Sequence, residues 1–183
     1  MKKTVWTFGL ISGAILSAMM AISMPFVDAL GNDRGEILGY TTMVLSFLLV
    51  YFGVRSYRDN VAGGKIRFGR ALVVGTLIMV VASVCYVATW EVIYFGIRPD
   101  YAARFEQVAL AKARSGGGSP QAIQRKVADA QRFLRLYRNP AINAAITFLE
   151  PLPVGLVIAL VSAGVLSRRR RREAASGLTT ALP

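Results

Sequence analysis

The chain has 183 residues, of which 54% are hydrophobic and 17% charged, and its formal net charge is +12. Long apolar runs with little charge are typical of membrane spans and rare in soluble domains of this size. The basic residues gather in blocks between the apolar runs, which argues against a nucleic-acid-binding protein. Composition therefore predicts one small bundle of spans without a second globular domain.

The sequence contains no histidine and a single cysteine, Cys85. The lack of histidine excludes Ser-His and Cys-His nucleophile pairs and the histidine-based zinc motifs. No other pairing of nucleophile and base is visible. We therefore expect a protein that is not an enzyme and that carries no resident cofactor.

Four apolar runs are long enough to cross the hydrocarbon core, which takes about 20 helical residues. They cover roughly residues 5–27, 37–54, 71–95 and 146–166. The first run follows Lys2 and Lys3, as a signal peptide would, but it exceeds the roughly 7–15 apolar residues of a signal sequence. We expect it to be an uncleaved span.

Two carboxylates lie in or beside these runs, Glu91 near the outer end of the third and Glu150 near the outer start of the fourth. One interpretation is that both reach headgroup water or pair with an arginine such as Arg98 or Arg138. The other is that they form a pair that binds a cation or exchanges a proton, because ionisable groups at membrane depth are often functional.

Basic residues in short loops predict the cytoplasmic side. They follow the second and fourth runs: Arg55, Arg58, Lys65, Arg67 and Arg70, and then Arg168, Arg169, Arg170, Arg171 and Arg172. Both termini are therefore expected in the cytoplasm, with 168–183 as a basic tail without regular structure. The same residues either serve only as an orientation signal or contact anionic lipid headgroups.

The segment 98–140 must then lie outside, although it is also basic, because long loops translocate with less regard to charge. Its apolar spacing predicts two antiparallel helices, about 99–114 and 120–138. The stripe of the first helix is Tyr101, Phe105, Val108 and Lys112, and that of the second is Ile123, Val127, Ala130, Leu134 and Tyr137. Ser119 is expected to cap the second helix, with Pro120 at its first position and a break at Asn139 and Pro140.

Small residues recur every four positions in the first and fourth runs, at Gly9, Gly13 and Ser17 and at Gly155, Ala159 and Ala163. This spacing lets helices approach closely in lipid. The contact could lie within one chain or in a homo-oligomer, and for four spans we favour the first.

Three stretches together resemble a known family: "GGKIRFGRALVVGTLI", "YVATWEVIYF" and "RLYRNPAINAAITFLEPLPVGLVIALVSAGVLSRRR". They are similar to a bacterial family of small integral membrane proteins, the domain-of-unknown-function family 4199. The resemblance implies four spans with a helical insertion before the last, and it implies no reaction, ligand or catalytic residue.

The expected fold is all-α, a four-helix transmembrane bundle over 1–167 with an extramembrane antiparallel hairpin, 98–140, between spans three and four. We expect the bacterial cytoplasmic (inner) membrane as its location. Its expected role is that of a non-enzymatic interaction or scaffold protein that uses the hairpin to contact a protein partner or lipid headgroups. The alternative is a small ion- or proton-coupled transporter or channel component that uses Glu91 and Glu150.

Overall fold

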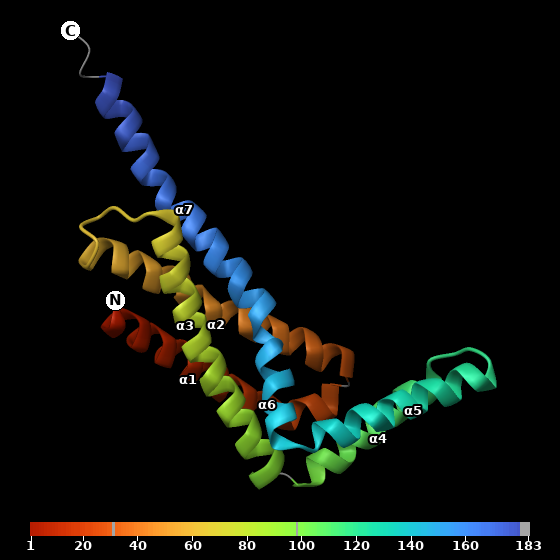
Figure 1. Ribbon diagram of the computed structural model, residues 1–183. Helices are drawn as coiled ribbons and strands as arrows, with labels where there is room; N and C mark the ends of the chain where they lie inside the picture. Colours follow the sequence, from red (N-terminus) through yellow and green to blue (C-terminus); the bar gives the residue numbers. More distant parts are fainter. Residues whose placement is uncertain (31, 98, 180–183) are drawn as a thin grey trace. The chain divides into compact units, whose positions relative to one another are not determined.

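The structure is a computed structural model that describes residues 1–30, 32–97 and 99–179, with the side chains of 1–23, 37–97, 103 and 106–167. Within these ranges the chain is helical apart from short turns, and it contains no strand. The helices are α1 Lys2–Leu30, α2 Asn32–Asn60, α3 Phe68–Glu91, a π-helical segment η1 Val92–Ile97, α4 Pro99–Ser115, α5 Pro120–Tyr137, α6 Pro140–Leu149 and α7 Pro151–Thr179 (Figure 1).

Four helical stretches are long and apolar enough to cross a membrane, Lys2–Ser23, Ile37–Asn60, Phe68–Ile97 and Pro140–Ser167. The all-α fold with four spans is therefore confirmed. The fourth stretch starts earlier than the sequence predicts and consists of two helices, α6 and α7, that meet at Glu150. The break has a local cause, because Pro151 lacks the N–H that would continue α6 and suits the first turn of a new helix.

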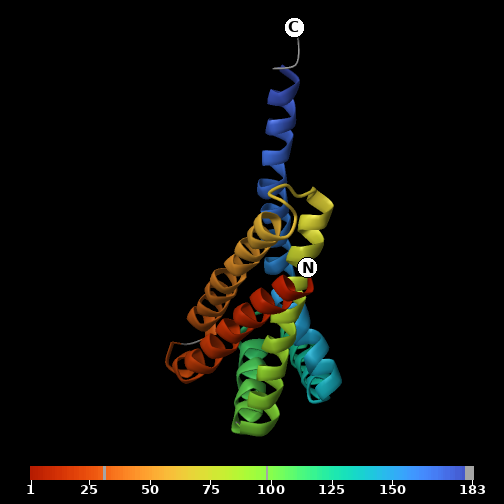
Figure 2. The same ribbon diagram turned by 90° about the vertical axis from the view of Figure 1, so that its left-hand side faces the viewer.

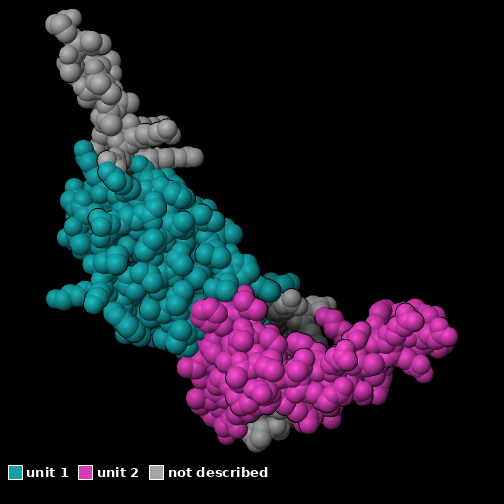
Figure 3. Space-filling view, in the orientation of Figure 1, with its two compact units in different colours: residues 1–86, 150–183 teal, residues 87–149 magenta. Residues whose placement is uncertain are grey.

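The chain divides into two compact units, residues 1–86 with 150–183 and residues 87–149, which Figure 3 shows in different colours. In the first unit, α1 and α2 lie side by side (Figures 1 and 2), and α2 also packs on α7. Its core contains fully buried residues of α2, α3 and α7 such as Phe47, Ile78 and Ala159. Many large apolar side chains of this unit are exposed, as expected for surfaces that face lipid.

The small residues of α1 pack against α3. A methyl group added at Gly9 would lie 2.7 Å from Val81 Cβ, and one added at Gly13 would lie 2.6 Å from Cys85 Cβ. The Ser17 hydroxyl donates a hydrogen bond to the Cys85 carbonyl at 3.4 Å. The stripe therefore allows two helices of the same chain to come into close contact.

The small residues of α7 meet a different face of α3. A methyl group added at Gly155 would collide with the Met79 side chain, and one added at Gly75 would lie 3.2 Å from Ala159 Cβ. Ala163, the third member of the stripe, is fully buried. The prediction that both stripes pack within the chain is confirmed, and α3 is the helix that both of them contact.

In the second unit, α4 and α5 pack against each other. The predicted stripe of α5 is confirmed: Leu134 and Tyr137 are buried and its other members are half-buried. The predicted stripe of α4 is wrong where it can be checked, because Val108 and Lys112 are exposed. The half-buried residues of α4 are instead Glu106, Ala109, Leu110 and Ala113, and the side chains of Tyr101 and Phe105 lie outside the described residues.

The turn between α4 and α5 is held by specific hydrogen bonds. The Ser119 hydroxyl accepts from the Ala122 N–H at 3.3 Å, which confirms the predicted cap. The Lys126 ammonium donates to the carbonyls of Gly116 and Gly117, at 2.8 and 3.2 Å, and so satisfies acceptors left at the end of α4. At the other end of the pair, Arg138 forms an ion pair with Glu106.

The predicted break at Asn139 and Pro140 is confirmed. Helix α5 ends at Tyr137, and the Asn139 side chain accepts from the Ala141 N–H at 3.0 Å, capping α6. Helix α7 continues to Thr179, beyond the fourth span. This differs from the predicted tail without regular structure over 168–183, of which residues 180–183 and the side chains from 168 onward lie outside the described residues.

Candidate functional site

Glu150 lies at the junction of α6 and α7, beside a cavity in the first unit. Its Oε2 accepts a hydrogen bond from the Tyr86 hydroxyl of α3 at 3.0 Å. The cavity has a volume of about 280 Å³ and is lined by Tyr86, Glu150 and three residues of α2, Gly39, Tyr40 and Met43. The site thus combines one carboxylate and two tyrosines, each from a different stretch that is long and apolar enough to cross the membrane.

Local sequence explains why this cavity exists. Pro151 starts a new helix, so Glu150 lies in the turn between two helices. Gly39 contributes no side chain, and a methyl group added there would meet no other atom within 4 Å. The open space beside the carboxylate is therefore not filled by packing.

Two buried serine hydroxyls lie on the same helix faces, about one turn away along the chain. Ser83 precedes Tyr86 by three residues in α3, and Ser46 follows Met43 by three residues in α2. Both hydroxyl oxygens are buried, and neither has a hydrogen-bond partner among the described residues. A carboxylate, phenols and hydroxyls supply the oxygen ligands that hard cations take, and they can also hold a proton.

Glu91 has different surroundings in the second unit. It is the last residue of α3, and the π-helical segment η1 begins directly after it. Its Oε1 is buried and has no hydrogen-bond partner within the described part of the chain. The expected pairing with Arg138 is not found, because Arg138 instead pairs with Glu106, and the Arg98 side chain lies outside the described residues.

Glu91 and Glu150 belong to different units of the chain. A carboxylate pair formed by the two therefore stays a prediction. Tyr40 and Tyr86 are instead the titratable residues that accompany Glu150.

The second unit has a hydrogen-bonded core that the sequence analysis missed. Asn143 of α6 is fully buried, and its side-chain oxygen accepts from the Trp90 indole N–H at 2.9 Å and from the Thr147 hydroxyl at 3.2 Å. Its side-chain nitrogen donates to the Tyr137 carbonyl at 3.2 Å. One asparagine thus joins the end of α3, the end of α5 and its own helix.

Aromatic rings extend this core. Tyr94 of η1 lies edge-on to Tyr137 of α5 with ring centroids 5.6 Å apart, and Tyr137 stacks on Phe133 at 5.4 Å. Such ring pairs contribute roughly 0.5–1.5 kcal/mol beyond their buried area. The base of α5 is therefore fixed to its neighbours by both polar and aromatic contacts.

The basic residues predicted to contact lipid are found around the end of α2 and the start of α3. Asp59 pairs with Arg58 at 2.7 Å and with Arg55 at 3.7 Å. Lys65, Arg67 and Arg70 line a separate cavity. The side chains of Arg168, Arg169, Arg170, Arg171 and Arg172 lie outside the described residues.

Within the described part of the chain, no group of three or more Cys, Asp or Glu side chains is placed to hold a metal ion. Comparison with known proteins gives one finding on family. A model of a family described as "Protein of unknown function (DUF4199)" matches residues 7–168, whereas no curated protein and no solved structure matches the chain. The match covers most of the sequence, including most of the first apolar stretch and all of the other three, so the chain belongs to the domain-of-unknown-function family 4199.

Proposed function

We propose that this integral membrane protein is a non-enzymatic interaction protein whose contact element is the helix pair α4–α5. The observation that carries the proposal is the buried network around Asn143, which fixes α5 to the ends of α3 and α6. A connecting loop has no need of a fully buried, hydrogen-bonded asparagine at its base. A rigid base is what an element that presents a binding surface requires.

The charge on the pair indicates what it would bind. Among its described side chains, the acids are Glu106 and Asp129. The cations are Lys112, Arg114, Arg125, Lys126, Arg132, Arg135 and Arg138. Arg125, Arg132 and Arg135 are exposed, and so are the apolar side chains of Phe133 and Leu136. Exposed arginine beside aromatic and aliphatic side chains is typical of protein interfaces, so the proposed partner is a protein with an acidic contact surface.

Site-specific photo-cross-linking in cells tests this role. A photoreactive amino acid is placed at Arg132 on the exposed face of α5, and a control is placed at Asn60 at the end of α2. The proposal expects a discrete adduct from position 132 only, and its loss when Arg125 and Arg135 are changed to glutamine. The proposal fails if position 132 gives no discrete adduct and deletion of 103–136 leaves every cellular phenotype unchanged.

The cavity at Glu150 supports a second candidate function, ion or proton binding linked to transport. The specific observation is the Tyr86–Glu150 hydrogen bond beside an open cavity at membrane depth. Four spans leave little room for a pore, so this function calls for a homo-oligomer. The opposing argument is that a carboxylate at the end of a span can also serve only to reach headgroup water.

Liposome flux separates the two candidates. If the cavity carries ions or protons, Glu150→Gln should reduce flux at least tenfold and Tyr86→Phe should reduce it less, because only the first removes the charge. Asp129→Asn on the exposed face of α5 is the matched control and should leave flux unchanged. If the original protein and the three variants all show the same low leak across ions and pH, this second function is excluded.

A further inference from the structure

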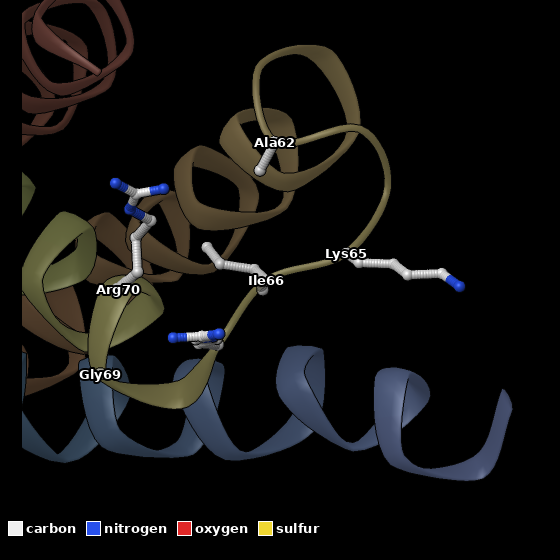
Figure 4. A pocket seen from close by; sticks show the side chains of 6 residues that line it. Ala62, Lys65, Ile66, Gly69 and Arg70 are labelled. Carbon is white, nitrogen blue, oxygen red and sulfur yellow. The ribbon is translucent and has the colours of Figure 1, made fainter. Parts of the chain in front are cut away.

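A basic cavity of the first unit lies where the chain turns from α2 into α3, and it shares no lining residue with the Glu150 cavity. It has a volume of about 650 Å³, and its lining includes Lys65, Arg67 and Arg70. Figure 4 shows Lys65 and Arg70 extending to opposite sides of Ile66. We propose that this cavity binds the phosphate headgroup of an anionic phospholipid.

Charge is the first argument. From Arg55 to Trp90 the sequence has five cations and a single acid, Asp59. Arg55 and Arg58 already pair with that carboxylate. The sequence therefore gives residues 55–90 a net charge of +4, which favours the binding of an anionic headgroup.

The start of α3 adds to this charge. Arg67 precedes the first helical residue, and its backbone carbonyl accepts from the Ala71 N–H at 3.0 Å. Its side chain has no acceptor atom with which to cap the helix, and the first turn of α3 contains no acidic residue. First-turn N–H groups and the positive end of the helix dipole favour an anion at this position.

The cavity is formed in advance of any ligand. Ile66 is 2% exposed and anchors the turn in the core. The Gly64 N–H donates to the Arg58 carbonyl at 2.9 Å, and the Ala62 N–H donates to the Tyr57 carbonyl at 3.0 Å. Gly63 and Gly64 have φ angles of +65° and +81°, which glycine adopts without strain. A fixed turn lowers the entropy cost of binding.

The location favours a lipid over a soluble phosphate. Two of the four predicted spans meet here, since Ile37–Asn60 ends and Phe68–Ile97 begins on either side of the turn. Another cavity of the first unit, at the same end of α2, combines Arg55 and Arg58 with apolar residues of α7, Val165 and Leu166. A phospholipid has this combination of an anionic head and an apolar chain, whereas inorganic phosphate has only the first.

Gly69 provides a sharp test, because it lines the cavity and a methyl group added there would meet no other atom within 4 Å. In Gly69→Glu a carboxylate enters the cavity while every cation stays in place, and the first turn of a helix tolerates an acid well. The matched control is Gln124→Glu on the exposed face of α5, which changes the net charge by the same amount. A second pair compares Arg67→Gln/Arg70→Gln with Arg125→Gln/Arg132→Gln.

The experiment is native mass spectrometry of the full chain in non-ionic detergent, titrated with phosphatidylglycerol or phosphatidylcholine. A cation near an anionic headgroup contributes about fivefold in affinity, so we expect roughly 30-fold weaker phosphatidylglycerol binding in Arg67→Gln/Arg70→Gln. Gly69→Glu should weaken binding at least fivefold, and both controls should stay within about twofold of the original protein. If Arg67→Gln/Arg70→Gln does not fold, the phosphatidylglycerol affinity of Gly69→Glu tests the proposal by itself.

Three results would overturn the proposal. Equal affinity for the two lipids would show that negative headgroup charge is not recognised. Unchanged phosphatidylglycerol binding in Gly69→Glu would place the lipid elsewhere on the chain. Displacement of the lipid by millimolar inorganic phosphate would show that the cavity is a site for a soluble anion.

Discussion

Gly13 allows α1 to pack closely on α3, so one added methyl group there should lower the stability of the protein. In Gly13→Ala the new Cβ would lie 2.6 Å from Cys85 Cβ and 2.8 Å from its Sγ. The Cβ of Cys85 cannot move without its helix, so α1 must separate from α3. We expect a loss of about 1–3 kcal/mol in the free energy of unfolding, the usual range for overpacking.

The control for this substitution is Gly164→Ala, where the added methyl group meets no other atom within 4 Å. Alanine also has the higher helix propensity, so this variant should be neutral or slightly stabilised. Thermal unfolding in detergent micelles measures the stability of Gly13→Ala and of Gly164→Ala. Equal melting temperatures for the two variants would show that α1 does not pack on α3 through Gly13.

Asn143 is the second residue at which a single change is informative. Asn143→Ala leaves the Trp90 indole N–H without its acceptor and the Tyr137 carbonyl without a side-chain donor. Each unsatisfied buried group costs about 1–3 kcal/mol, so we expect a clear loss of stability and faster amide exchange in residues 134–147. Hydrogen exchange followed by mass spectrometry measures this.

Asn60→Ala is the matched control, because Asn60 is exposed and its side chain donates to the Ser56 hydroxyl at 3.2 Å. Its exchange should match that of the original protein. If amide exchange is also unchanged in Asn143→Ala, the hydrogen bonds of Asn143 do not hold the base of the helix pair rigid.

The sequence shows that Asn143 is a polar residue in an apolar segment, and no more. Its partners Trp90 and Tyr137 are 53 and 6 residues away along the chain, and helical spacing relates only residues within one helix. For the same reason the hydrogen bond between Tyr86 and Glu150, 64 residues apart, could not be predicted. The candidate carboxylates follow from the sequence, but their partners require the tertiary structure.

At the scale of elements, α5 offers two leucines with opposite environments. Leu134 is 4% exposed on the face toward its neighbours, whereas Leu136, two residues later, is 50% exposed. Leu134→Ala should cost about 2–5 kcal/mol, the range for deleting a buried leucine side chain. Leu136→Ala should cost less than about 0.5 kcal/mol.

The readout is amide exchange across α4 and α5, with far-ultraviolet circular dichroism to confirm that the spans stay helical. Faster exchange in Leu134→Ala alone is the expected result. Equal exchange in both variants would mean that α5 does not pack through the stripe that contains Leu134.

The two helices of the pair also show where pattern analysis succeeds. The stripe of α5 was predicted correctly because its large apolar residues recur every three or four positions. The stripe of α4 was wrong in part because its half-buried residues include Ala109 and Ala113, which allow close approach but are weak hydrophobic signals. Lys112 fits the spacing, yet its ammonium group is kept in water by the cost of burying a charge.

At the scale of the whole molecule, the number of spans follows from the sequence, because the thickness of the hydrocarbon core sets the length of each apolar run. The sequence predicts the break within the fourth span only in part. The prolines after Glu150 indicate a weakened helix, but the start of α6 at Pro140 depends on the Asn139 cap. The sequence analysis starts the fourth span at residue 146, whereas α6 begins six residues earlier, next to the Asn139 cap.

The loop charges predict that the chain crosses the membrane so that segment 98–140 and the basic turn between α2 and α3 lie on opposite sides. The most direct measurement is labelling of single cysteines in intact cells with a membrane-impermeant maleimide. The two probes are Asn60→Cys at the turn and Gln124→Cys on α5, both in a Cys85→Ala background that also serves as the unlabelled control. If the prediction holds, Gln124→Cys is labelled in intact cells, and Asn60→Cys is labelled only after the membrane is permeabilised. Labelling of both positions from the same side would contradict it, because the stretch Phe68–Ile97 would then not cross the membrane.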